Sequence, residues 1–483
     1  CAPDGGLWSS ANNGGTWSTN TDQLSPIGTS DVDFDPTNSQ IMYLATGDGD
    51  AGDTYSIGVL KSTDGGGTWN TTGMIWTTSQ SRRIYKLMIN PQNKNVVFAA
   101  TNVGLYRTTN AGTSWAVVQA GAFTDIEYKP SDTTTVYGVT TQLYGGTTTF
   151  YKSTNGGSTF TSTATGLPAS ANCFRFALAV TANNSAYVYL LACNATNYGF
   201  YGFYQSTNSG TAFTSKATTP NLLGWASNGN DASSGGQGWY DLSIAASPTN
   251  ANEVIVGGVN IWRTTNGGTN WSLFGHWTGS GAPYVHADVH WLDYKNGTTI
   301  YVGCDGGVFY TTNSGASFSA INGSMNIAQQ YKMGHSSSTY SLAIAGHQDN
   351  GTNLFTGGWN RTLGGDGMSA FIDWNNNNVM YGEQYNGSFN RTTNGGTSWG
   401  AITTGMSGTG AWNTPWHQDP NVANTLYGAR NQMFKTTNQG NNWSQIGTIS
   451  GTSTLTIVEF AVAPSNSQVI YVIRGGNGGS LTS

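Results

Sequence analysis

Residues 62–69, with the sequence STDGGGTW, decide the fold. They place a Ser, an Asp two residues later, a run of Gly and a closing Trp in one short segment. An Asp or Asn side chain can bond to the backbone of a tight turn, and Gly adopts positive φ at no steric cost. The pattern predicts a tight turn between two antiparallel strands, after which the aromatic ring returns to the core.

Eight further segments carry the same pattern of Ser or Thr, Asp or Asn, Gly and a final Trp or Phe. They begin at Ser10, Thr108, Ser153, Ser206, Thr264, Thr311, Thr392 and Thr436. One such match could arise by chance, but nine in register could not. The chain is therefore interpreted as a repeat protein.

The spacing of these segments predicts their architecture. Successive segments start 44 to 58 residues apart, except for one gap of 81 residues after Thr311. One four-stranded propeller blade takes about 40–45 residues. The long gap therefore predicts a blade without the motif, roughly at residues 327–366. Strand-like runs such as IMYLAT (41–46) precede the motifs, so each blade is expected to read strand A, strand B, strand C, motif turn and strand D.

The two ends of the chain look complementary. The N-terminus resembles the segment CDGGVFY (304–310), which follows a B strand, and the C-terminus supplies strands A and B and the start of C. We expect an all-β propeller of about ten blades in a single ring over residues 1–483. Pairing of residues 1–18 with residues 453–483 would close the ring and remove exposed sheet edges. The alternative is part of a two-propeller array.

The composition excludes several classes of protein. Charged residues are 9% of the chain and aromatic residues 12%, which is not the composition of a disordered protein. The 18 basic residues are scattered and the net charge is −6, so no nucleic-acid partner is expected. The apolar runs are far shorter than the about 20 residues of a membrane helix, so this chain is not expected to insert into a membrane.

The cysteines predict a compartment. Cys173 and Cys193 flank two strand-like runs that are joined by a turn near Asn183. In an antiparallel hairpin centred there they would sit opposite each other, which is compatible with a disulfide. A disulfide implies an oxidising, extracellular compartment, whereas two free buried thiols are the alternative. Cys1 and Cys304 have no evident mates.

The repeats resemble Asp-box propellers, also called bacterial neuraminidase repeats, over essentially the whole chain. The segments HADVHWLDY (286–294), HQDNGT (347–352) and GGDG (364–367) are most similar to secreted bacterial sortilin-like propellers. This resemblance implies a secreted or surface-anchored binding protein. A more distant similarity to xyloglucan-cleaving endoglucanases, whose catalytic Asp precedes Gly-Gly as Asp4 and Asp305 do, implies a glycoside hydrolase.

The loops before strand A and between strands B and C of a propeller gather on one face, where ligands usually bind. The ligand-binding residues predicted there are His286, Asp288, His347, Gln348, Asn350, Trp239 and Trp412. The candidates for catalysis are Asp305, Asp349 and Asp366, and we expect the acidic residues and His286 to share one rim. The aromatic residues that could line a sugar groove are Trp225, Trp239, Tyr240, Trp277, Trp412 and Trp416.

No motif requires a cofactor, but two groups of residues are suitable metal ligands. His286, Asp288 and His290 alternate along a strand and would suit a transition metal. Asp48, Asp50 and Asp53 alternate with glycines in a turn and would suit Ca²⁺. The alternative interpretations are a hydrogen-bonded network between blades and a solvated acidic turn.

We expect an extracellular or cell-surface protein that binds a glycan or a cell-surface protein. The alternative is a glycoside hydrolase with paired Asp carboxylates about 5–10 Å apart. We expect no hydrolysis by this chain alone, because Asp305, Asp349 and Asp366 lie beside glycines in turns. Water there would keep the pKa of a carboxyl group near its ordinary value, which makes a poor acid at neutral pH.

Overall fold

The computed structural model describes residues 1–50, 52–230, 235–449 and 455–475. The chain forms two compact units, Cys1–Asn326 and Ile327–Ser483, called unit 1 and unit 2 below. The regular structure is almost entirely β, as predicted. The described residues contain no helix long and apolar enough to cross a membrane.

Unit 1 consists of antiparallel sheets that follow one another in chain order. A short sheet pairs β1 (Trp8–Ser9) with β2 (Ser18–Thr19). The next sheets are β3 (Thr29–Phe34), β4 (Met42–Thr46), β5 (Gly58–Ser62) and β6 (Asn70–Ile75); β7 (Ile84–Ile89), β8 (Val97–Thr101), β9 (Gly104–Thr108) and β10 (Ala116–Gln119); and β11 (Phe123–Lys129), β12 (Asp132–Thr140) and β13 (Phe150–Ser153). The last three are β14 (Cys173–Val180), β15 (Val188–Asn194), β16 (Phe200–Ser206) and β17 (Thr214–Ala217); β18 (Ser243–Ala246), β19 (Val254–Gly257), β20 (Ile261–Thr264) and β21 (Ser272–Gly275); and β22 (Val289–Tyr294), β23 (Ile300–Cys304), β24 (Gly307–Thr311) and β25 (Ser319–Ala320).

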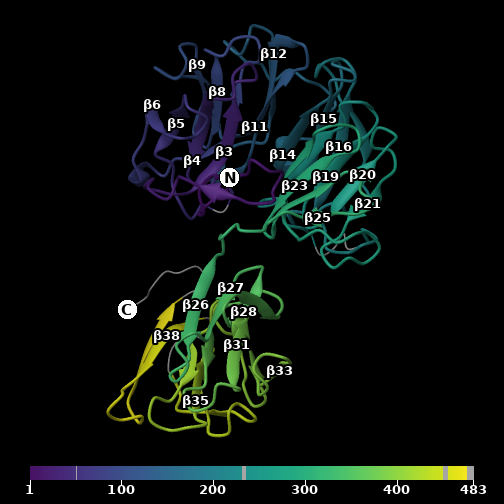
Figure 1. The fold of residues 1–483 in the computed structure, drawn as a ribbon. Coiled ribbons are helices and arrows are strands. Elements are labelled where there is room, and N and C mark those ends of the chain that lie inside the picture. Colours follow the sequence, from purple (N-terminus) through teal and green to yellow (C-terminus); the bar gives the residue numbers. More distant parts are fainter. Residues whose placement is uncertain (51, 231–234, 450–454, 476–483) are drawn as a thin grey trace. The chain divides into compact units, whose positions relative to one another are not determined.

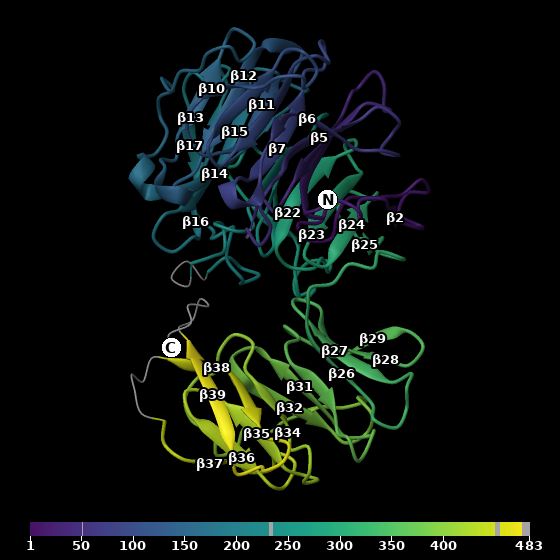
Figure 2. The ribbon, with the colours of Figure 1, turned by 90° about the vertical axis from the view of Figure 1, so that its left-hand side faces the viewer.

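Unit 2 continues the same pattern, and Figure 2 shows its sheets in a row from β26 to β39. They are β26 (Gln330–His335), β27 (Ala343–His347), β28 (Gly351–Phe355) and β29 (Trp359–Leu363); β30 (Ala370–Ile372), β31 (Met380–Gln384), β32 (Ser388–Thr392) and β33 (Gly400–Ala401); β34 (Trp416–Gln418), β35 (Leu426–Ala429), β36 (Met433–Thr436) and β37 (Ser444–Gln445); and β38 (Thr456–Val462) with β39 (Ile470–Gly475). Short 3-10 turns occur at η1 (Thr78–Gln80), η2 (Leu143–Gly145), η3 (Ser170–Asn172) and η4 (Tyr385–Gly387).

The second strand of each sheet carries much of the core. Every residue of β4 and β8 is buried, because both faces of a strand in this position pack on neighbouring sheets. Tyr43 and Ala99 lie in one apolar cluster between the first two four-stranded sheets, and Phe98 lies in the next cluster. The continuous apolar runs in the sequence are thus strands buried on both faces.

Each of the nine motif segments forms the same turn. In residues 62–69 the hydroxyl of Ser62 donates to Asp64 Oδ1 (2.7 Å), and the N–H groups of Gly66 and Thr68 donate to Ser62 Oγ (2.8 Å) and Asp64 Oδ1 (2.9 Å). The same three bonds recur in the other eight segments. The sheet β26–β29 lies in the gap where a blade without the motif was predicted.

The sheets of unit 1 make contact all the way around the unit. The first strands of successive sheets touch, from β3 and β7 through to β18 and β22, and Figure 1 shows β3, β11 and β14 following one another across the unit. Residues 1–20 join the two ends of this series. Trp17 Nε1 donates to the carbonyl oxygen of Ile321 after β25 (2.6 Å), and the N–H of Thr29 donates to the carbonyl oxygen of Ala2 (3.2 Å). The N-terminal residues therefore lie between the β22–β25 and β3–β6 sheets.

The predicted single ring of ten blades is not confirmed, because the chain divides into two units. This division is compatible with the two-propeller alternative. The predicted pairing of residues 1–18 with 453–483 would join one unit to the other. Within the described ranges β1 pairs with β2 and β38 pairs with β39, and residues 453–454 and 476–483 lie outside those ranges, so this pairing stays a prediction.

The predicted disulfide between Cys173 and Cys193 is wrong. A bulge shifts the register of β14 against β15, so Cys173 pairs with Asn194 and Cys193 pairs with Arg175. The two thiols point to opposite faces of the sheet and pack in different apolar clusters. Both are free and buried, and burial raises the pKa of Cys173 to about 12. These two free thiols give no support to the prediction of an oxidising compartment.

Candidate functional site

The predicted site residues lie at one edge of their sheets, where first strands begin and second strands end. The register shows this directly, since Val289 pairs with Cys304 in unit 1 and Gln330 pairs with His347 in unit 2. The loops before the first strands and the turns after the second strands therefore meet at the same edge in every sheet. His286, Asp288 and Asp305 lie at this edge in unit 1, and Asp349 and Asp366 at this edge in unit 2. A rim shared by both groups would span the two units and stays a prediction.

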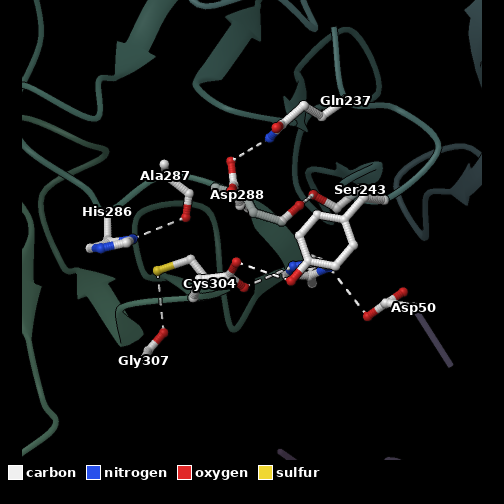
Figure 3. A network of polar contacts seen from close by, with 12 residues as sticks. Asp50, Gln237, Ser243, His286, Ala287, Asp288, Cys304 and Gly307 are labelled. Carbon is white, nitrogen blue, oxygen red and sulfur yellow. Dashed lines mark hydrogen bonds and ion pairs between the residues drawn. The ribbon is translucent and has the colours of Figure 1, made fainter. Parts of the chain in front are cut away.

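His290 is the centre of a polar network in unit 1, because a carboxylate lies at each of its ring nitrogens; Figure 3 shows Asp50 and Asp288 among the residues of this network. Its Nδ1 lies 3.2 Å from Asp50 Oδ2 and its Nε2 lies 3.0 Å from Asp305 Oδ1. Burial disfavours the charged ring, but the charges of both carboxylates and the bonds to them outweigh it and raise the pKa of His290 well above its ordinary value. The hydroxyl of Tyr240 donates to Asp305 Oδ2 (3.0 Å). This arrangement ties the turn after β4 to strand β22 and the turn after β23.

The predicted histidine metal site is not assembled. Asp288 has a φ of 62° and the strand is bulged between Val289 and Trp291, which breaks the alternation that would align His286, Asp288 and His290. His290 has a carboxylate at each ring nitrogen, while Figure 3 shows His286 turned toward the carbonyl oxygen of Ala287. In the described part of the chain these three residues do not bring one ligand atom each within 4.8 Å of one another.

The carboxylates of the acidic turn after β4, predicted as calcium ligands, do not point toward one common centre either. The side chain of Asp48 is buried and accepts the N–H groups of Asp50 (2.7 Å) and Asp53 (3.0 Å), and that of Gly52. Asp50 turns instead toward His290. The charge and hydrogen bond of His290 overcome the effect of burial and hold the pKa of Asp50 below its ordinary value. The turn is therefore closed by its own backbone, and Asp53 is exposed.

Two carboxyl groups next to this network are Asp288 and Asp241. Asp288 accepts a hydrogen bond from Gln237 Nε2 (3.0 Å). Burial, reinforced by the charge of Asp305, raises the pKa of Asp288 to about 6. Asp241 has no exposed surface, and burial followed by the charge of Asp288 raises its pKa well above the ordinary value. Asp241 and Gln237 were not among the predicted site residues, and they stand at either end of the segment QGWYD (237–241).

Unit 2 presents two aromatic rings that lie flat against each other. The ring centroids of Tyr385 and Trp412 are 5.3 Å apart with an angle of 15° between the planes. The two side chains are 46% and 43% exposed, and they are called the stacked pair below. Trp412 Nε1 donates to the hydroxyl oxygen of Tyr331 (3.0 Å), whose own hydroxyl donates to Gln348 Oε1 (2.7 Å). Trp412 and Gln348 were predicted ligand-binding residues, whereas Tyr385 and Tyr331 were missed.

A buried carboxyl group holds the loops that carry the stacked pair. Glu383 Oε1 accepts the N–H groups of Gly387 (3.0 Å) and Thr414 (2.9 Å). The N–H of Asn386 also donates to the carbonyl oxygen of Trp412 (3.1 Å). Burial raises the pKa of Glu383 to about 8. These bonds join the turn after β31, which carries Tyr385, to the loop before β34, which carries Trp412.

The remaining predicted residues of unit 2 lie in the turn after β27 and the loop after β29. His347 Nδ1 lies 2.8 Å from Asn353 Nδ2, and the ring meets Trp359 edge-on at 5.7 Å. The N–H of Asp349 donates to Asp366 Oδ1 (3.1 Å), and Asn350 Nδ2 donates to the carbonyl oxygen of Gln348 (3.1 Å). Among the predicted loop aromatics, Trp225, Trp239 and Trp277 are exposed, whereas Trp416 is buried.

No protein-family model and no curated protein matches the chain. Among solved structures, the GH74 enzyme of Niastella koreensis is similar over 100% of this chain and 82% of that one, with 18% identity and a TM-score of 0.52. An ancestral GH74 enzyme is 16% identical over 93% of this chain and 74% of that one, with a TM-score of 0.49. PorZ, a surface component of the type-IX secretion system of Porphyromonas gingivalis, is 12% identical over 95% and 60%, with a TM-score of 0.47. At such identity the likeness shows the fold alone, which is that of a β-propeller.

Proposed function

We propose that this β-propeller binds a polysaccharide, and that the stacked pair in unit 2 is the surface on which sugar rings lie. The observation that carries the proposal is the nearly parallel arrangement of Tyr385 and Trp412, with both rings close to half exposed. Exposed aromatic rings present flat apolar faces that fit the CH patches of a sugar ring. An aromatic contact adds about 0.5–1.5 kcal/mol beyond the burial of its surface.

Polar groups beside the stacked pair suit the hydroxyl groups of a sugar. The hydroxyl of Tyr331 links Trp412 to Gln348, and Gln348 and Asn350 lie in the turn after β27. Amide groups donate and accept hydrogen bonds, as sugar hydroxyls require. A few polar groups around an aromatic surface are the usual composition of a small-ligand site. The proposal keeps an extracellular or cell-surface location, where polysaccharides are found.

Replacing Trp412 by Ala is expected to weaken polysaccharide binding about tenfold, since the loss of one ring contact corresponds to about 1.4 kcal/mol. Retention of the whole chain in gels that contain a panel of polysaccharides would measure this. Tyr340→Ala is the matched control, because Tyr340 is a fully exposed aromatic residue at the opposite edge of a sheet in the same unit. Equal losses of polysaccharide binding by Trp412→Ala and Tyr340→Ala would contradict the proposal. A chain that binds a protein partner but none of the polysaccharides would also contradict it.

We expect no hydrolysis of polysaccharides by this chain, although a GH74 enzyme shares its fold. A glycoside hydrolase needs one carboxyl group as acid and a second as nucleophile or base. Both oxygens of Asp305 are engaged by His290 and Tyr240, and Asp366 Oδ1 accepts the N–H of Asp349. Release of reducing ends from the same panel measures the activity. Steady release that Asp305→Asn abolishes would show that the chain is an enzyme.

A further inference from the structure

Four carboxyl groups and one histidine lie close together in unit 1, whereas the stacked pair belongs to unit 2. His290 forms ion pairs with Asp50 and Asp305. Its charge also acts on Asp241 and Asp288, which lie close enough to interact with each other. An oxygen of Asp288 also lies within 4.8 Å of an oxygen of Asp305. The cationic groups that act on these four carboxyl groups are His290, Arg175 on Asp50 and His286 on Asp288.

Asp241 is the unusual member of this group. It has no exposed surface, and neither of its carboxylate oxygens has a hydrogen-bond partner among the described residues. An enclosed carboxylate without partners is among the most costly features that a folded protein can contain. The groups that act on Asp241 belong to the same cluster: the charge of Asp288 raises its pKa and the charge of His290 lowers it.

The backbone around Asp288 brings its side chain into this region. Asp288 has a φ of 62°, a left-handed conformation that Asp tolerates better than most residues. The residue lies in the loop that enters β22, whereas Asp241 lies in the loop that enters β18. The amide of Gln237 meets Asp288 Oδ1 at 3.0 Å, and turning this amide over would offer an oxygen in place of the nitrogen.

We propose that Asp241 and Asp288, with Asp305 beside them, form a binding site for a hard divalent cation, with Ca²⁺ as the preferred ion. Carboxylate and amide oxygens are the ligands that Ca²⁺ takes, and Ca²⁺ accepts irregular sets of six to eight oxygens. A cation would give both oxygens of Asp241 a partner and would offset the repulsion between neighbouring carboxylates. This site differs from the acidic turn at Asp48, Asp50 and Asp53.

The cation would join the entry loops of β18 and β22. The first of these loops carries the exposed ring of Trp239 and also Tyr240, which bonds to Asp305. The hydroxyl of Ser243 donates to the carbonyl oxygen of Val289 (2.9 Å), so the two sheets are already in contact just below. Binding of the ion is therefore expected to order this edge of unit 1.

The test uses the whole chain after dialysis against a chelator, with Ca²⁺ added back in a calorimeter and in a thermal melt. Wild-type protein is expected to bind Ca²⁺ and to melt a few degrees higher with it. Asp241→Asn and Asp288→Asn are each expected to weaken Ca²⁺ binding at least about tenfold, as loss of a charged ligand does. Asp53→Asn, in the exposed acidic turn, is the matched control and should bind as the wild type does.

Two variants keep the test decisive, because Asp288 is only partly buried and its Asn variant should fold even if Asp241→Asn does not. Binding of Mg²⁺ that depends on the same two residues would support the site with a smaller hard cation. Absence of Ca²⁺ and Mg²⁺ binding by the wild type would overturn the proposal and show that a proton stabilises Asp241. Binding lost in Asp53→Asn but kept in Asp288→Asn would also overturn it, as would binding of Zn²⁺ alone.

Discussion

Replacing Phe389 by Ala is expected to lower the free energy of unfolding of unit 2 by about 3–5 kcal/mol, the usual cost of removing a buried Phe ring. Phe389 has no exposed surface and lies flat on Trp416, with ring centroids 4.1 Å apart and an angle of 9° between the planes. Its ring also contacts Trp443. The substitution would leave a cavity that these two large side chains cannot refill without moving.

This buried contact supports the exposed stacked pair. Phe389 lies in β32, directly after the turn that carries Tyr385, and Trp416 begins β34, directly after the loop that carries Trp412. Hydrogen exchange of the β30–β37 peptides under native conditions would report the loss within the whole chain. Tyr471→Ala is the control, since Tyr471 is 69% exposed in the same unit and should cost at most about 0.5 kcal/mol. Similar exchange in the two variants would contradict this account of the core.

Replacing Glu383 by Gln is expected to stabilise unit 2 at alkaline pH. Burial raises the pKa of Glu383 from 4.5 to about 8 in the folded protein, so the folded state holds a proton that the unfolded state has lost. Below pH 4.5 the contribution of Glu383 to the free energy of unfolding is fully present. This contribution falls by up to about 1.4 kcal/mol per pH unit as the pH rises towards 8. Gln has nearly the same shape, keeps an oxygen for Gly387 and Thr414, and does not ionise.

Urea unfolding of the whole chain at several pH values measures this difference. The wild type should lose stability between pH 4.5 and about 8, and Glu383→Gln should lose less. Glu459→Gln is the control because Glu459 is an exposed glutamate of unit 2. Parallel pH profiles for the wild type and Glu383→Gln would show that Glu383 is ionised in the folded protein.

The repeated turns could be predicted from the sequence because each one depends on residues that are close together. Ser62 and Asp64 bond within their own turn, and the other eight segments repeat that local pattern. The sheet β26–β29 could be placed in the gap because the spacing of the motifs along the chain left room for one further blade. Local bonds of this kind depend little on how the sheets are arranged.

The errors and omissions depend on longer-range geometry. The bulge that moves Cys193 away from Cys173 has no signature in the alternation of residues. Asp241 is fully enclosed, which the sequence does not show. Tyr385 and Trp412 come from different sheets, whose loops meet at Glu383. Hydrophobic pattern predicts which residues are buried in a strand, but it does not predict which loop side chains meet.

The most direct test of the central claim is a crystal structure of the chain with an oligosaccharide drawn from the polysaccharide that it retains best. The account predicts a sugar ring lying parallel to the rings of Tyr385 and Trp412, with hydroxyl groups toward Gln348 or Tyr331. A bound oligosaccharide that leaves the stacked pair uncovered, or a chain that retains no polysaccharide at all, would contradict it.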